Sequence, residues 1–427
     1  MDVTRRALRA VAARPRVLLA TLPGGTPVRL ATERQLRLRD WPMAATPAEA
    51  DLLVVAGPGR PDSRPPLDRL WRDMPAPRAR VHAPTVNDVG PALNDGRTRL
   101  RSPVGEDAGH LEQAGHHEPV DRRDAHDSHG GHGGHGGHGA HRAHGGHDSH
   151  GGHDGTETRG GLPMAERGED RDGLTLDRLH VPLGPFLVDW PPGLTVRLVL
   201  QGDVVQRAEP AEVMAYGPGP VGDTPTPFWA RPWLRAEAGE PVTVGEAVRR
   251  RSAAHLDSLG RLLAVAGWPA EAVVARRLRD DLLAEASPAA YAPRLERFAH
   301  RVGRSRTLAW LTRGIGELST EEARERGVGG PAARAGGDVT DRYRQWLTDL
   351  RLDVRRLDEP ALLDPTAEES PRGRWKTGRP PPSAALVALL PRMLAGTELA
   401  AARLVVAGLD PDPDELAANG AEVTAGA

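Results

Sequence analysis

The chain has 427 residues, of which 39% are hydrophobic, and it contains 49 glycines and 40 prolines. This length and composition predict two or three domains rather than one tightly packed core. The 56 basic and 58 acidic residues leave a net charge of −2, so net charge does not point to a nucleic-acid or anionic-membrane partner. The absence of cysteine excludes disulfides, thiolate nucleophiles, cysteine-ligated iron–sulfur clusters and thiolate-bridged nickel–iron sites.

No apolar run approaches the roughly 18 residues of a membrane-spanning helix. The N-terminal segment MDVTRRALRAVAARPR also lacks the apolar region of a secretion signal. We therefore expect a cytoplasmic protein that contacts a membrane only through partners, as a peripheral component on the cytoplasmic face of the plasma membrane. No nucleic-acid partner is expected.

The first part of the chain, residues 1–83, is typical of an α/β domain. Two short aliphatic runs at 16–20 and 51–57 have the composition of buried parallel strands, and a helical segment at 67–74 follows the second run. Residues 84–172 contain almost no clustered aliphatic residues and are dominated by Gly, His, Asp and Arg. Because loops inside compact domains rarely exceed about 15 residues, this segment is predicted to be a disordered linker.

The linker carries a run of histidines at every third position. With glycine between them, a polyproline-like extension of three residues per turn would align the imidazoles, which are ligands for nickel, zinc and copper. Such a flexible chain offers many equivalent ligand sets, which excludes a closed structural site. Two interpretations stay open: a segment that stores or delivers loosely bound Ni²⁺ or Zn²⁺, and a solvated low-complexity linker. The candidate metal ligands are His126, His129, His132, His135, His138, His141, His144, His147, His150 and His153.

After the linker, a β-rich segment at 173–240 precedes a helical region at 241–427. Aliphatic residues alternate on both sides of Gly202, which predicts a β-hairpin. From Thr243 the apolar spacing is helical, and Thr243 with Glu246 forms a capping-box pattern. Three helices are predicted, each with an apolar stripe. The first ends at Gly267 and carries Leu256, Leu259 and Leu263. The second starts near Pro269 and carries Val274, Leu278 and Leu282, and the third starts at Ser287-Pro288 and carries Leu295, Phe298 and Val302.

Two segments of the first region, TPAEADLLVVAG at 46–57 and DMPAPR at 73–78, resemble the NADH-quinone oxidoreductase (complex I) component that is related to the nickel–iron hydrogenase small subunits. The resemblance covers roughly residues 16–83, the small-subunit-like region, and implies a partial flavodoxin-like sheet. In that family, cysteines before the strand and after the second segment hold an iron–sulfur cluster. The corresponding segments here, 21–25 and 81–84, contain no cysteine, so the cluster is not implied.

Residues 314–338, GIGELSTEEARERGVGGPAARAGGD, resemble a segment of the hydrogenase large subunits and of their relative in complex I. The resemblance spans about residues 174–418, the large-subunit-like region, and implies an α+β fold with a hairpin region and a helical bundle. Four further pieces follow the order of that family: Leu183-Gly184-Pro185, Ala254-His255-Leu256, Ser370-Pro371-Arg372-Gly373 and the run from Leu389 to Pro411.

The residues that carry chemistry in these families are missing. Where the complex I relative of the large subunits has a loop with two histidines that meet the quinone head group, this chain has FLVDWPPG at 186–193. Where hydrogenases have a C-terminal cysteine pair, it has DPDPDE at 410–415. No catalytic residue, iron–sulfur cluster or nickel–iron centre is therefore expected.

Two glycine-containing segments have structural and functional interpretations. Residues 314–338 could approach a cofactor, but a tight connection between helices is the favoured interpretation. Within them, Arg334 either anchors Asp338 or Asp341 or is solvated. Pro23-Gly24-Gly25 only faintly suggests a phosphate loop, because the spacing of known phosphate-binding motifs is absent.

Two further features involve titratable residues. His255, on an apolar stripe, is interpreted as a core histidine rather than a ligand. The acidic run at 410–415 could hold a hard cation, but its proline spacing does not match a calcium loop, so a solvated acidic turn is favoured.

Three functions are weighed. The first is a structural or assembly component of a membrane-associated complex I-like (NADH dehydrogenase-like) or hydrogenase-like complex, with the other subunits as partners. The second is an oxidoreductase subunit that lines a quinone pocket. This function lacks support, because electron transfer needs a redox centre and quinone reduction needs a proton donor, and the residues that supply them in the resembled families are missing here. The third is a nickel- or zinc-handling protein. The first is favoured, and the chain is not expected to be active alone.

Overall fold

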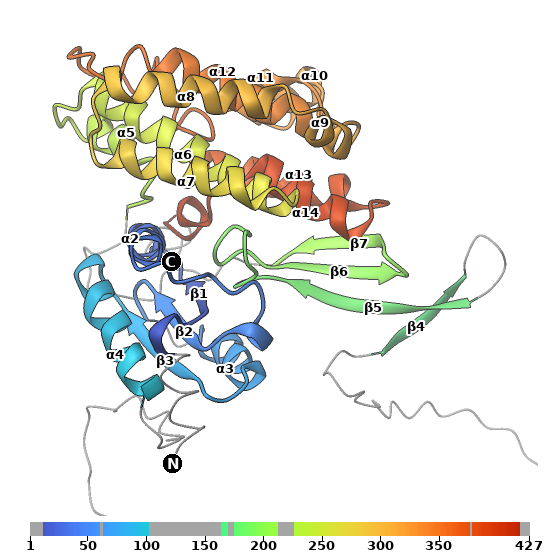
Figure 1. Ribbon diagram of the computed structural model, residues 1–427. Helices are drawn as coiled ribbons and strands as arrows, with labels where there is room; N and C mark the ends of the chain where they lie inside the picture. The colour runs from blue at the N-terminus through green and yellow to red at the C-terminus, as the bar shows by residue number, and fades with distance from the viewer. Residues whose placement is uncertain are drawn as a thin grey trace, which may run out of the picture. The chain divides into compact units, whose positions relative to one another are not determined.

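A three-stranded parallel sheet forms the N-terminal region of the computed structural model, which describes residues 12–59, 63–101, 164–169, 175–211, 226–375 and 378–418. The strands β1 (Val17–Thr21), β2 (Leu52–Ala56) and β3 (Ala79–Ala83) lie in that order. All five residues of β2 are buried, as expected for a central strand covered on both faces. The predicted α/β layering is confirmed (Figure 1).

Helices cover both faces of this sheet. The apolar sides of α2 (Thr26–Leu38) and α4 (Val89–Arg101) pack on one face, and α3 (Arg64–Asp73) packs on the other. Short 3-10 turns at Pro47–Glu49 and Val86–Asp88 precede β2 and α4.

The structure places α4 inside the range 84–172 that composition assigned to the linker. Val89, Leu93 and Leu100 of this helix are buried, and they share one face together with two small residues, Ala92 and Gly96. Polar residues separate these positions, so the average composition of the segment does not indicate an apolar helix face. The folded N-terminal region therefore extends to at least Arg101.

A second sheet is antiparallel, with the order β4 (Met164–Glu169), β5 (Thr175–Leu183), β6 (Val196–Gln201) and β7 (Val204–Pro210). The predicted hairpin is confirmed: Gln201 pairs with Val204, and Gly202 adopts a left-handed φ of 64°. The buried side chains of β6 and β7 pack on the helices α13 and α14.

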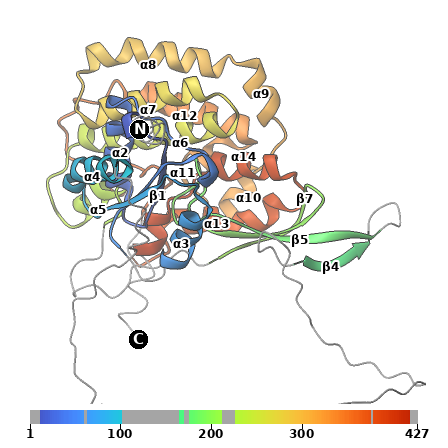
Figure 2. The same ribbon diagram turned by 60° about the horizontal axis from the view of Figure 1, so that its bottom comes forward.

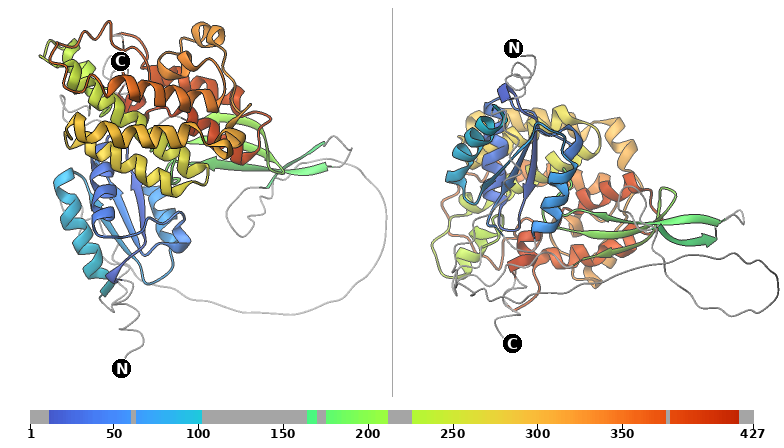
Figure 3. Two further views of the ribbon diagram at one scale, coloured as in Figure 1. Left: turned by 45° about the horizontal axis from the view of Figure 1, so that its top comes forward. Right: turned by 90° about the horizontal axis from the view of Figure 1, so that it is seen from below.

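The remaining elements are helical, and they include the three predicted long helices. Helix α6 packs against α7, α12 and α14, and Figure 3 shows these helices from two further directions. The bounds are α5 (Arg231–Glu237), α6 (Val244–Val265), α7 (Pro269–Leu283), α8 (Pro288–Gly303), α9 (Arg306–Thr312), α10 (Thr320–Glu325), α11 (Gly330–Ala335), α12 (Val339–Asp353), α13 (Pro382–Leu394) and α14 (Leu399–Leu409).

The local signals at the ends of these helices are those predicted. The Thr243 side chain caps α6 by accepting a hydrogen bond from the backbone N–H of Glu246, and Gly267 follows the helix with a φ of 77°. The predicted stripes are buried except at Val274, which is 36% exposed. The neighbouring Ala275 is buried instead, because the buried positions 271, 275, 278 and 282 alternate spacings of four and three and leave Val274 at the edge of the face.

The α/β region and the helices belong to one compact unit, which contains every residue that the structure describes. Within the described ranges, no helix combines the length and the apolar character needed to span a bilayer.

Candidate functional site

Two charged residues of α2 lie on its face away from the sheet. The helix starts after Gly25, where a Cβ atom would come within 2.4 Å of the Ala56 carbonyl oxygen, so only glycine fits there. Val28 packs on the sheet, whereas Arg29 and Glu33 are one turn apart on another face and are 7% and 4% exposed. Charges buried to this extent require ionic partners.

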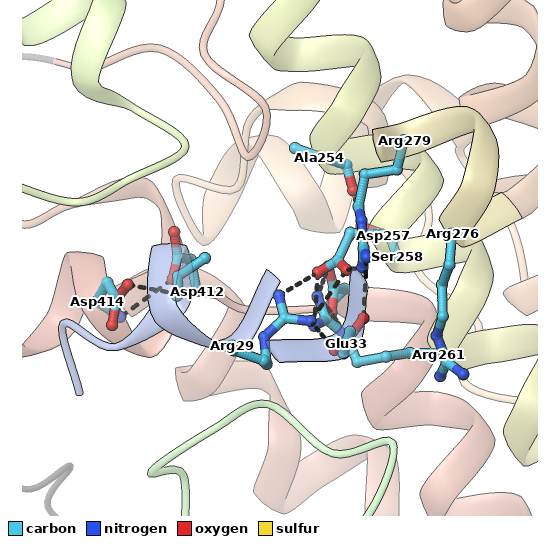
Figure 4. Close-up of polar contacts among 12 residues, drawn as sticks. Arg29, Glu33, Ala254, Asp257, Ser258, Arg261, Arg276, Arg279, Asp412 and Asp414 are labelled. Atoms are coloured by element: carbon cyan, nitrogen blue, oxygen red, sulfur yellow. Dashed lines mark hydrogen bonds and ion pairs between the residues drawn. The ribbon is translucent and has the colours of Figure 1, made fainter. Parts of the chain in front are cut away.

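Those partners come from helices α6 and α7. Both terminal nitrogens of Arg29 donate to Asp257 of α6, at 2.8 and 3.2 Å. Arg279 of α7 donates to Asp257 at 2.5 Å and pairs with Glu33 at 2.9 Å. Figure 4 shows these side chains converging between the three helices. Asp280 extends the group toward solvent by pairing with Arg37.

The same group of charges continues along α6 toward the C-terminus. Arg261 pairs with Asp257 at 2.8 Å and with Asp410 at 2.7 Å. Asp410 follows α14 in a left-handed conformation and also accepts hydrogen bonds from Ser258 and Arg372, each at 2.5 Å. We call the connected set Arg29, Glu33, Asp257, Arg261, Arg279, Arg372 and Asp410 the charge network.

Glu33 of α2 and Asp257 of α6 are held ionised by the arginines around them. Burial alone would raise the pKa of Glu33, but Arg279 and Arg29 outweigh it and hold the pKa at about 2. Burial likewise opposes ionisation of Asp257, yet Arg261, Arg29 and Arg279 lower its pKa well below the usual range. Glu33 and Asp257 therefore carry negative charge beside these arginines over the ordinary pH range.

The acidic segment at 410–415 has a different environment from the one predicted. We expected a solvated turn, but Asp410, Asp412, Asp414 and Glu415 are all buried, which corrects that interpretation. The segment turns inward because Asp410 is fixed by the charge network and its neighbours pack under α2 and α13.

Asp414 binds the turn that precedes α2. It accepts hydrogen bonds from the Gly24 backbone N–H and the Thr26 hydroxyl, both at 2.7 Å. This contact argues against a phosphate loop at Pro23-Gly24-Gly25, which the sequence only faintly suggested. A carboxylate of the chain itself occupies the amino end of α2, where a phosphate would bind.

The other two acids have incomplete partners. Asp412 accepts only from the Asp414 backbone N–H, at 3.0 Å, and Glu415 from the Ser383 backbone N–H, also at 3.0 Å. One carboxyl oxygen of each has no hydrogen-bond partner. Burial raises the pKa of Asp412, Asp414 and Glu415, and their mutual proximity adds to the effect at Asp412. In the described part of the chain, no group of three or more His, Asp or Glu residues is arranged to hold a metal ion.

A cleft borders the charge network. The loop at 185–192 lines it together with Thr21 of β1 and Arg276 of α7. Its empty volume is about 520 Å³ including the open mouth, but only about 50 Å³ admits the centre of a water molecule. That is room for roughly four waters. The cleft is lined by three arginines and three acids, so it favours neither charge: Arg29, Arg261, Arg276, Glu33, Asp189 and Asp257.

A smaller cavity lies between His255, Ser258, Arg372 and Asp410, with about 10 Å³ for water centres, enough for at most about one water. His255 is 1% exposed, and burial together with nearby arginines lowers its pKa well below the usual value. It is therefore a neutral core histidine, as interpreted from the sequence, although its Nε2 atom lacks a hydrogen-bond partner.

The remaining sequence candidates are placed as follows. The glycine-rich segment 314–338 connects α9, α10, α11 and α12, and Gly330 lies so close to Arg372 that a Cβ atom would be 2.7 Å from its carbonyl carbon. Arg334 pairs with Asp349 and Glu369 rather than with Asp338 or Asp341. The ten histidines from His126 to His153 lie outside the described residues.

The charge network itself was missed by sequence reasoning. A signal existed in α6, where Asp257 and Arg261 are the only Asp, Glu, Lys or Arg residues from 252 to 263 and every residue of that range is buried. Charges four residues apart in a fully buried helix indicate an internal ion pair. The partners on α2 could not be found in this way, because Arg29 and Asp257 are separated by 228 residues.

Comparison with known proteins gives little further information. No family model and no curated protein matches the chain. Among solved structures, it is similar to a chain of the membrane-bound sulfane sulfur reductase, an archaeal respiratory membrane complex. The two share 14% identity with a TM-score of 0.40, over 56% of this chain and 98% of that one. At this level the likeness is weak and identifies no function.

Proposed function

We propose that this chain is a structural component of a membrane-associated, complex I-like or hydrogenase-like oxidoreductase assembly, in which the small-subunit-like and large-subunit-like regions are joined in one polypeptide. The observation that supports this most is the charge network, in which α2 of the first region is bound to α6 and α7 of the second.

The contacts support a structural role for three reasons. The polar groups between the two regions are mostly engaged with one another. The segment that matches the hydrogenase cysteine pair is folded inward on Thr26, Ser383 and Arg261. The sequence supplies no thiolate for the centres that transfer electrons in the resembled families. Retention of the scaffold without these ligands favours a role in holding partner subunits.

Isolation of a tagged full-length chain from native membranes in mild detergent tests this proposal. We expect the chain to comigrate in fixed stoichiometry with identified membrane-embedded oxidoreductase subunits, and the isolated chain to have no quinone reductase activity. Recovery as a lone protein with quinone reductase activity would contradict the proposal. An Arg334→Ala or His255→Ala variant that lost that activity would then support an enzymatic role.

A quinone-binding role is the second candidate, and the cleft beside the 185–192 loop favours it. Phe186 and Val188 provide apolar walls next to the ionic groups. Room for only a few waters means that the loop would have to move before a quinone head group could enter. Saturable labelling of this loop by a photoreactive quinone would promote this candidate, and labelling only elsewhere would remove it.

A further inference from the structure

One tryptophan differs from all the others in its exposure. The chain has nine tryptophans, all within described residues, and Trp310 alone is in the exposed class, at 75%. It lies on α9, whose buried side consists of Leu308, Ala309 and Thr312. Single exposed apolar residues are common on protein surfaces, so Trp310 needs a second feature before it indicates a function.

The second feature is the charge of the segment around Trp310. Residues 293–314 contain six arginines and a single acid, Glu296, in a chain whose charges otherwise nearly cancel. Glu296 is paired with Arg351 of α12. Arg294 and Arg301 pair with acids of α7. Four exposed arginines have no ion pair within the described ranges: Arg297, Arg304, Arg306 and Arg313.

The helical spacing aligns these residues in two rows. Arg297 and Arg301 lie four residues apart on α8, and Arg304 follows three residues later at its C-cap. Arg306 and Trp310 lie four residues apart on α9, and Arg313 follows directly after its end. Figure 2 shows α8 and α9 following one another along the outer edge of the helices. We call the exposed side chains of residues 293–314 the α8–α9 edge.

We infer that the α8–α9 edge docks directly on an anionic lipid bilayer. Tryptophan prefers the headgroup level of a bilayer, because its ring is apolar and its N–H is polar. Arginines are attracted to anionic headgroups and can keep their apolar stems along the interface. Neither cleft described above includes a residue of this edge. The combination of one exposed tryptophan with unpaired arginines matches the apolar and anionic layers of a lipid surface.

This contact would be made by the chain itself, whereas the proposed function places membrane attachment in its partners. The two are separable, because the lipid test uses the purified full chain with no partner present. A failure of lipid binding would leave the assembly proposal standing.

Tryptophan fluorescence with vesicles gives the first readout. On mixed phosphatidylcholine and phosphatidylglycerol vesicles at neutral pH and low salt, we expect a blue shift and protection of Trp310 from acrylamide. Pure phosphatidylcholine vesicles should produce neither effect, and added salt should reverse both, because exposed charges are screened. The other tryptophans are buried or partly buried, so the response reports mainly Trp310.

Vesicle co-sedimentation of variants assigns the contact to residues. Trp310→Ala should weaken binding about tenfold, and Arg306→Ser with Arg313→Ser should weaken it about 30-fold, or about 1 kcal/mol for each arginine. The matched controls are Leu362→Ala, an apolar side chain 68% exposed, and Arg69→Ser with Arg72→Ser on the exposed side of α3, all expected to bind as wild type.

Two results would overturn the inference. One is a chain that fails to bind anionic vesicles at low salt, which would instead favour an acidic protein as the partner of this edge. The other is vesicle binding that the Trp310 and arginine variants leave unchanged, which would place the lipid contact in another part of the chain.

Discussion

Two groups of buried acids lie close together in this protein, and their surroundings shift their pKa values in opposite directions. Glu33 and Asp257 in the charge network each contact two or three arginines, and their pKa values are lowered. Asp412 and Glu415 are equally buried, but Arg372 is the cation that acts on both and Asp414 is a further acidic neighbour, and burial raises their pKa values. The comparison shows that the number of cationic partners, rather than burial, decides the direction in which the pKa of an internal acid shifts.

The largest effect is expected at the centre of the network. Asp257→Asn removes the charge that compensates Arg29, Arg261 and Arg279, so three buried cations would lose their shared partner. The free energy of unfolding in urea should fall by about 3–5 kcal/mol. As a control, Glu296→Gln breaks an exposed pair with Arg351 and should cost less than about 1 kcal/mol. Similar losses for both variants would show that the network is not buried as described.

The next-largest effect is a difference in how the two groups of buried acids change the free energy of unfolding with pH. Glu33 has a lowered pKa in the folded state, so its stabilisation is present above its ordinary titration range and is lost as pH falls toward about 2. Glu33→Gln should therefore reduce the free energy of unfolding by about 3 kcal/mol at pH 7. The deficit should shrink when urea unfolding is repeated in acid. A deficit that is independent of pH would mean that Glu33 contributes packing rather than charge.

Asp412 should behave in the opposite sense. Its pKa is raised in the folded state, so the folded protein retains a proton that the unfolded chain has lost above about pH 4. Stability contributed by this group therefore falls as pH rises through that interval. Asp412→Asn should raise the melting temperature at pH 8 by about 2–4 °C, which corresponds to roughly 1 kcal/mol, and by less at pH 4. The exposed Asp203→Asn should leave the melting temperature unchanged at both pH values.

The smallest effect concerns the contact between the acidic segment and α2. Thr26→Val keeps the shape of the side chain but removes the hydroxyl that donates to Asp414 at 2.7 Å. We expect a loss of about 1 kcal/mol in the free energy of unfolding. Thr98→Val, at an exposed hydroxyl that bonds within α4, provides the control and should be nearly neutral. Equal values for the two variants would indicate that the Asp414 contact does not stabilise the folded protein.

The parts of the fold that the sequence predicts are those with local signals. The cap at Thr243, the alternation around Gly202 and the aliphatic run of β2 each specify their own structure over a few residues. Helix α4 escaped prediction because its buried face includes Gly96 and Ala92 among polar residues.

The candidate site depends on contacts between distant residues. Arg29 and Asp257 meet only because α2 and α6 pack together, and the acids after Asp410 are buried only because Thr26 and Ser383 receive them. An acidic segment separated by prolines has the composition of a solvated turn, and nothing within it indicates that it is covered. Burial of these charges is a property of the tertiary structure.

The central claim of the functional proposal is that the chain contributes structure and not electron transfer. Stepwise anaerobic reduction of the purified full-length protein, followed by visible absorbance and then by addition of a soluble quinone, tests it most directly. We predict no visible band, no uptake of electrons and no quinone reduction above the buffer rate. A band that bleaches on reduction and returns when quinone is added would contradict the claim.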